Sequence, residues 1–250
     1  MTVHPLPFAS YVDAIETETA LFAEAVDGAD LEATVPSCPD WTLAHLAEHV
    51  GMVQRWFTKL LAEDTQERPA SREVETGLPL EPGQHPAWLL TGAAKARAVL
   101  DELDPNRPMW TWGADGRAQF WARRMLFETL VHRWDAELTV GKESVVDTTL
   151  AADGVDEYLV NMPHSWIFAP KTANLRGKGE VIAFHSTDTG EEWHVQLRED
   201  SFGLIPGGLP DATVKGTAVE LLLFLVRRTT DLPYVGSREL YELWTANSDF

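Results

Sequence analysis

The stretch RAQFWARRMLFETLVHRWDAELTV, residues 117–140, is the segment that decides how the first half of the chain folds. It continues without interruption to Gly141, and glycine is a common residue just past the end of a helix. We therefore expect a long helix over residues 117–140.

Three more helices are expected before this one, because apolar residues recur near helical spacing and a first-turn proline opens the third. They cover residues 8–26, 41–61 and 86–103. Pro36, Pro39 and Asp40 form a stop-and-restart signal before the second helix, and Asp40 or Thr42 can cap it. The polar residues 63–86 form a long connection. Four long helices in sequence predict a four-helix bundle.

The second half of the chain has a different pattern, with short segments separated by turns that contain Gly or Asp. Strands are expected over residues 181–185, 192–198, 202–205 and 213–215. A helix is expected over residues 218–228, which contain a nearly continuous apolar run. This half is therefore predicted to be a small α+β domain. We place the joint near residues 141–147 and the two domains at 1–143 and 144–250.

Composition and charge exclude several classes of protein. The chain is 44% hydrophobic and 24% charged, which is ordinary for a folded soluble protein, and it has no apolar run long enough to span a membrane. Residues 1–10 lack a signal-peptide pattern, and the single cysteine, Cys38, allows no intrachain disulfide, so we expect a cytoplasmic protein. A net charge of −19 disfavours nucleic acids and anionic membranes as partners.

The spacing of histidine and glutamate on two expected helices suggests a metal site. His45 and His49 are four residues apart on one helix, and so are Glu128 and His132 on another. Residues four apart share a helix face, so Glu128, His132 and one histidine from the facing helix can form a three-ligand set with an open position. A solvated Glu–His pair or a core histidine would have the same spacing. However, a glutamate among apolar neighbours is costly to bury without a partner, and a cation removes that cost.

Two motifs resemble a known family. The segment VPSCPDWTLA, residues 35–44, continuing to His49-Val50-Gly51, and the segment RRMLFETLVHRWDAE, residues 123–137, resemble the motifs of mycothiol-dependent maleylpyruvate isomerase-like proteins. The second half is similar to the sterol-carrier-like domain of that family and includes LLLFLVRR, residues 221–228. The resemblance covers nearly the whole chain. It implies a DinB-like metal-binding four-helix bundle followed by a small α+β domain.

The resemblance also implies which residues form the site. His49, Glu128 and His132 match the family's metal ligands, and the metal is usually zinc with a water in the open position. Arg227 is the counterpart of a functional arginine that closes the apolar helix of the second domain, and Arg228 is the adjacent alternative. We expect Arg227 to reach the cleft between the domains, where thiol and substrate would meet.

Two positions stay open at this point. Relatives commonly hold Asp at the position of His45, so this residue could support a ligand from behind, lie on the surface, or act as a fourth ligand that closes the site. Cys38 belongs to the family's turn motif, and a packed residue near a helix start is favoured over a nucleophile.

The resemblance implies mycothiol, the low-molecular-weight thiol of actinobacteria, as cosubstrate. Zinc replaces the proton on a coordinated thiol, so a thiolate exists at neutral pH. Addition to a cis-enone acid such as maleylpyruvate allows bond rotation and elimination to the trans isomer, whereas an epoxide or alkyl electrophile would give a stable conjugate. A zinc hydrolase and a non-catalytic small-molecule binding protein are the alternatives. The sequence does not identify the substrate, and a monomer or weak dimer is expected.

Overall fold

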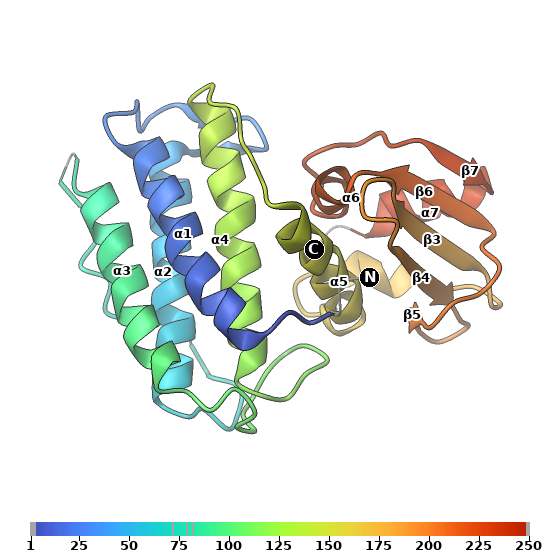
Figure 1. Ribbon diagram of the computed structural model, residues 1–250, viewed down its shortest axis with the longest axis horizontal. Coiled ribbons are helices and arrows are strands. Elements are labelled where there is room, and N and C mark those ends of the chain that lie inside the picture. The colour runs from blue at the N-terminus through green and yellow to red at the C-terminus, as the bar shows by residue number, and fades with distance from the viewer. Residues whose placement is uncertain (1–3, 72, 79, 82, 249–250) are drawn as a thin grey trace. The chain divides into compact units, whose positions relative to one another are not determined.

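The computed structural model describes residues 4–248 except residues 72, 79 and 82 (Figure 1). The chain divides into two compact units. The N-terminal unit contains residues 7–111 and 115–145, and the C-terminal unit contains the described residues of 1–6, 112–114 and 146–250. Within the described residues, no helix has the length and apolar character needed to cross a membrane.

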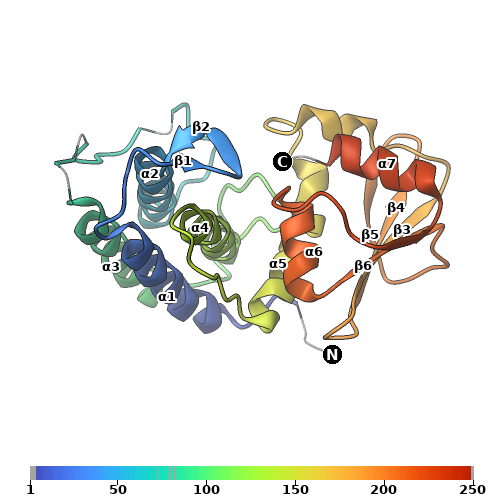
Figure 2. The ribbon, with the colours of Figure 1, turned by 90° about the horizontal axis from the view of Figure 1, so that it is seen from above.

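Four helices build the N-terminal unit. They are α1 (Phe8–Val26), α2 (Leu43–Ala62), α3 (His85–Asp101) and α4 (Gln119–Thr139). Helix α1 packs against α3 and α4, and α2 packs against the same two helices, as the end-on view of Figure 2 shows. The helical bundle expected from the sequence is therefore confirmed, and every expected helix end lies within two residues of the observed one.

The segment between α1 and α2 differs from the expectation. Strands β1 (Thr34–Val35) and β2 (Cys38–Thr42) form a short antiparallel hairpin, where the sequence predicted only a helix stop and restart. The residues before Pro36 and Pro39 favour extended backbone because the proline ring excludes the helical conformation there. Helix α2 consequently begins at Leu43 rather than at Trp41, and the Thr42 side chain caps it.

Buried contacts fix the rotation of α4 about its axis. Leu126 and Leu130 are fully buried, and Arg133 is 1% exposed. The Arg133 guanidinium lies 2.8 Å from Glu18 of α1 and 2.6 Å from Glu137 of α4. Each carboxylate offsets the cost of burying the guanidinium, and Glu18 is reached only at this rotation of α4, so the ion cluster allows little rotation of the helix. The directions of the other α4 side chains, including those of the site, follow from this.

The C-terminal unit is an α+β domain, as expected, and it is built on a five-stranded mixed sheet. The sheet order is β5-β4-β3-β6-β7, in which only the β3–β6 pair is parallel. The strands are β3 (Val181–Ser186), β4 (Glu192–Leu197), β5 (Phe202–Ile205), β6 (Ala212–Gly216) and β7 (Tyr234–Gly236). The helices are α5 (Thr148–Asn161), η1 (Met162–His164), η2 (Pro170–Asn174), α6 (Ala218–Leu225) and α7 (Arg238–Asn247).

Five of these elements were not expected from the sequence: the short 3-10 helices η1 and η2, and α5, β7 and α7. Helix α5 has a buried apolar face that includes Ala151, Val155 and Leu159, and it also buries the charged residues Asp153 and Glu157. Strand β7 is exposed along its whole length and therefore shows no alternation. Helix α7 buries only Trp244. The alternation that predicts a strand is thus absent from β7, whereas α5 and α7 carry apolar residues at helical spacing and were missed in spite of it.

The beginning of the chain is anchored in the C-terminal unit. His4 lies with Nδ1 2.9 Å from Asp153 and Nε2 3.4 Å from Glu191. Burial lowers the pKa of His4, but hydrogen bonds and charge from Asp153, with further contributions from Asp156 and Glu191, raise the pKa above its usual value. The protonated form of His4 is therefore the one that this pocket of carboxylates stabilises.

Candidate metal centre

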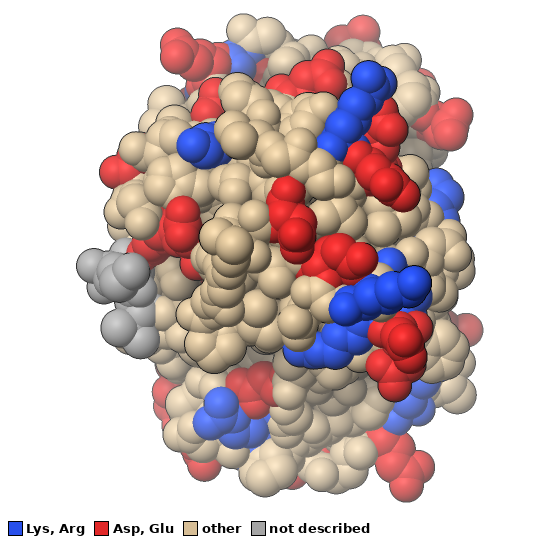
Figure 3. All heavy atoms as spheres, turned by 90° about the vertical axis from the view of Figure 1, so that its right-hand side faces the viewer, with Lys and Arg blue, Asp and Glu red and all other residues tan. Residues whose placement is uncertain are grey.

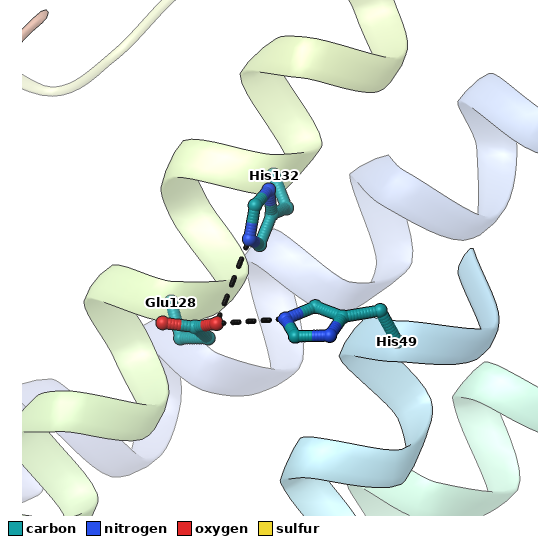
Figure 4. Close-up of side chains that lie close together, drawn as sticks. All are labelled: His49, Glu128 and His132. Atoms are coloured by element: carbon teal, nitrogen blue, oxygen red, sulfur yellow. Dashed lines mark hydrogen bonds and ion pairs between the residues drawn. The ribbon is translucent and has the colours of Figure 1, made fainter. Parts of the chain in front are cut away.

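Two facing helices bring three candidate ligands together. His49 projects from α2, and Glu128 and His132 project from α4 toward it (Figure 4). Glu128 Oε1 lies 3.0 Å from His49 Nε2 and 3.5 Å from His132 Nε2. One ligand atom from each residue lies within 4.8 Å of the others, which is close enough for one ion to contact all three. Two imidazole nitrogens and one carboxylate oxygen suit zinc and similar divalent ions.

Contacts within the cluster shift the pKa values of Glu128 and His132. Burial raises the pKa of Glu128, but hydrogen bonds from His132 and His49 and the charge of Arg124 outweigh it, so the pKa lies well below its usual value. Burial lowers the pKa of His132, yet the hydrogen bonds to Asp135 and Glu128 raise it overall. The carboxylate that favours the protonated form of His132 would also attract a divalent cation, and a cation bound to His132 would displace that proton.

The cluster is open to solvent on part of its surface. The His49 side chain is 30% exposed and the Glu128 side chain is 24% exposed, whereas His132 is 12% exposed. Structural zinc sites are closed by a fourth protein ligand, while catalytic sites keep a position for water or substrate. Within the described residues, three ligands and partial exposure match the second arrangement.

Several neighbours of the ligands were not singled out from the sequence. Arg124, one turn before Glu128, places Nη2 3.2 Å from the second carboxylate oxygen of Glu128. The Trp41 ring lies 4.8 Å from the His49 ring and 6.2 Å from the His132 ring, centre to centre. Asp135 contacts the far side of the His132 ring. Its position three residues after His132, on the same helix face, is the signal that could have indicated it.

His45 lies outside this cluster. It is exposed, and its backbone N–H donates to Thr42 Oγ1 at 3.3 Å while its Nδ1 accepts from the Thr42 backbone N–H at 3.4 Å. These two bonds form a capping box at the start of α2. Of the three roles left open by the sequence, the structure places His45 on the surface as part of a helix cap. Cys38 is half-buried in β2, opposite Val35.

Arg227 and Arg228 lie in the C-terminal unit, beyond the end of α6. The expectation that this helix continues to residue 228 is wrong, because it ends at Leu225 and Arg227 has a left-handed φ of +64°. The Arg227 guanidinium donates to the Thr245 carbonyl and lies 3.2 Å from Ser248 Oγ, at the end of α7. Arg228 donates to the Val226 carbonyl at 2.7 Å. Arg227 therefore has a structural role as a cation at a helix C-terminus.

A helical bundle that presents two histidines and a glutamate, followed by an α+β unit, defines a class of two-domain proteins with a candidate metal centre. Residues 12–137 match the family model for the mycothiol maleylpyruvate isomerase N-terminal domain, and residues 149–237 match the model for the C-terminal domain of the same proteins. The chain belongs to the mycothiol-dependent maleylpyruvate isomerase family.

Two solved structures support the assignment of the fold. Both are crystal structures of the mycothiol-dependent maleylpyruvate isomerase, one of them a mutant, and each aligns with a TM-score of 0.65 at 14% sequence identity. The alignments cover 94% of this chain and 95% of the other. A comparison with curated proteins finds no match.

Proposed function

We propose that this protein is a zinc-dependent enzyme that uses a low-molecular-weight thiol, mycothiol, to attack a small electrophilic substrate. The observation that carries the proposal is the partly exposed three-donor cluster of His49, Glu128 and His132 on facing helices. Family membership supports the same conclusion, because the related structures are named for a mycothiol-dependent isomerase. We expect the protein to act in the cytoplasm, where its single cysteine would stay reduced.

His49, Glu128 and His132 would bind the metal, and Arg124 and Trp41 would keep these three side chains in position. A zinc ion at this position would lower the pKa of a bound thiol, so that the nucleophilic thiolate is present at neutral pH. Arg124 contacts one oxygen of Glu128 and leaves the other directed at the two histidines. The Trp41 ring lies against the imidazoles and would exclude water from that side of the site.

Two reactions follow from the same thiolate. Addition to a cis-enone acid, followed by rotation and elimination, isomerises the double bond and regenerates the thiol. Attack on the carbon of an alkyl halide or an epoxide forms a stable carbon–sulfur bond instead, as halide ion leaves or as the ring carbon–oxygen bond breaks and its oxygen takes up a proton. The proposal covers both reactions, and Arg227 is the proposed partner of a substrate carboxylate, since a guanidinium can bind a carboxylate with two hydrogen bonds.

The surface charge favours small-molecule partners over nucleic acids. The net charge is −19, and on the face drawn in Figure 3 the described basic residues are dispersed among acidic ones rather than gathered in one patch. Polyanion binding depends on clustered lysine and arginine. We therefore propose a thiol and a small electrophile as partners, with neither nucleic acid nor membrane, and a monomer or weak dimer as the working form.

The test is to incubate the zinc-loaded protein with mycothiol and a panel of cis-enone acids, epoxides and alkyl halides. Isomer or conjugate that forms only with both thiol and zinc would support the proposal. Hydrolysis without thiol would indicate a zinc hydrolase, and binding without turnover would indicate a non-catalytic protein. The matched controls are His49→Ala, which removes a proposed ligand, and His45→Ala, which removes a histidine one turn away on the same helix.

A further inference from the structure

We infer that Asp135, supported by Ser37, is a positioning residue that orients His132 for metal binding. The inference rests on the proposed metal site and deepens it. Asp135 is not one of the three clustered ligands. It contacts Nδ1 of His132, on the side of the ring away from Glu128, so the metal site could form without a carboxylate there.

The three residues form one continuous hydrogen-bonded chain. His132 Nδ1 lies 2.9 Å from Asp135 Oδ2, and Ser37 Oγ donates to Asp135 Oδ1 at 2.5 Å. Asp135 is completely buried, and Ser37 is half-buried in the turn of the β1–β2 hairpin. The two oxygens of one carboxylate therefore connect the hairpin to a candidate ligand on α4.

This arrangement selects the form of His132 that can bind a metal. An ionised carboxylate only accepts hydrogen bonds, so Nδ1 must carry the hydrogen that lies between it and Asp135. In the neutral ring, Nε2 then carries the lone pair, and Nε2 is the atom 3.5 Å from Glu128 Oε1. Carboxylates that accept from the second nitrogen of a metal-bound histidine fix its tautomer and orientation and raise its basicity.

A role in folding alone is the alternative, because a buried carboxylate also contributes to stability. The same helix offers a matched comparison: Glu137 is buried, and it contacts Arg133 instead of a ligand. Ser144 is the corresponding hydroxyl, since it lies 2.7 Å from Arg133 Nη1. Changes at Glu137 and Ser144 disturb a buried ion cluster in the same unit without touching His132.

The experiment measures zinc affinity by competition with a chromophoric chelator, together with the melting temperature of the metal-free protein. Asp135→Asn should weaken zinc binding by about 10- to 100-fold, the usual effect of losing such a carboxylate. Ser37→Ala should weaken it by about two- to tenfold, because it acts only through Asp135. Glu137→Gln and Ser144→Ala should lower the melting temperature and leave zinc affinity at the wild-type value.

The outcomes separate this inference from the proposed function. A wild-type protein that takes up no zinc overturns the metal site and the inference with it. A wild-type protein that binds zinc no more tightly than Asp135→Asn overturns the inference alone. Should Asp135→Asn fail to fold, Ser37→Ala decides the matter, and zinc affinity equal to that of Ser144→Ala then refutes the positioning role. The ligand-field absorption of the cobalt-substituted protein gives a second readout, which should shift in Asp135→Asn and not in Glu137→Gln.

Discussion

His49 Nε2 and Glu128 Oε1 lie 3.0 Å apart although 79 positions separate the two residues in the chain. This contact joins α2 to α4 at the candidate metal centre. Since the carboxylate is already hydrogen-bonded to an imidazole, metal binding must exchange that bond for coordination. The hydrogen bond between His49 and Glu128 thus stabilises the metal-free protein and also keeps two of the candidate ligands close together.

The first prediction concerns metal content. Protein purified without chelators should contain about one zinc per chain, because a single three-ligand site holds one ion. His49→Ala or His132→Ala should lose the metal, and elemental analysis measures it. His45→Ala should keep the metal, because His45 is bonded to the α2 cap. If His45→Ala lost zinc and His49→Ala kept it, His45 and not His49 would be the ligand.

A second prediction concerns Arg227. A charge-assisted contact with a bound carboxylate contributes about 1.5–3 kcal/mol. Arg227→Ala should therefore lower kcat/KM by about ten- to a hundredfold or more while zinc stays bound, and Arg228→Ala should lower it much less. Steady-state kinetics at limiting substrate measures the effect.

The contacts of Arg227 in the structure offer a second explanation for its presence, which the same variant tests. Its guanidinium holds the end of α7 through Thr245 and Ser248. If that is its whole role, Arg227→Ala will lower the melting temperature and leave kcat/KM unchanged. Arg227→Lys separates the roles further, because lysine keeps a positive charge near the helix end but lacks the paired geometry for a carboxylate.

A third prediction concerns the pH dependence of stability. The pKa of His4 is raised in the folded protein, so protonation of His4 contributes stability that is fully present below its unfolded pKa, about 6.5, and is lost as pH rises through the folded pKa. His4→Gln should therefore lower the melting temperature more at pH 6 than at pH 9. His164→Gln, at an exposed histidine of the same unit, is the control. An equal effect of His4→Gln at both pH values would refute the prediction.

A fourth prediction concerns packing between α2 and α3. A Cβ added to Gly51 would lie 2.0 Å from the Trp88 ring, which also stacks under Arg55 at 3.9 Å. Gly51→Ala should therefore lower the free energy of unfolding by about 1–3 kcal/mol, the usual cost of overpacking. Urea denaturation measures it. Gly116→Ala should cost much less, because a Cβ there would meet nothing within 4 Å.

The bundle and the candidate ligands could be predicted because both depend on local spacing. Helical periodicity marked residues 8–26, and the four-residue spacing of Glu128 and His132 placed them on one face. Spacing alone could not separate His45 from His49, since both lie at positions compatible with one face. The difference comes from Thr42, whose side chain begins the helix and engages His45.

The missed parts depend on contacts between distant residues. The three-residue spacing could have placed Asp135 beside His132, but its hydrogen bond from Ser37, 98 positions earlier, follows no local pattern. The burial of Asp153 in α5 could not be predicted either, because its partner His4 lies 149 positions away. In the sequence, a charged residue that is buried against a distant partner cannot be told apart from a charged residue on the surface.

The anchoring of His4 has a consequence for the order of events during synthesis. His4 leaves the ribosome well before its partners Asp153 and Glu191, which follow 149 and 187 positions later. Domains fold largely as units while the chain is still growing. The four helices can therefore assemble while the residues just before α1 still lack their binding partners. His4 is thus made early and reaches its final place late.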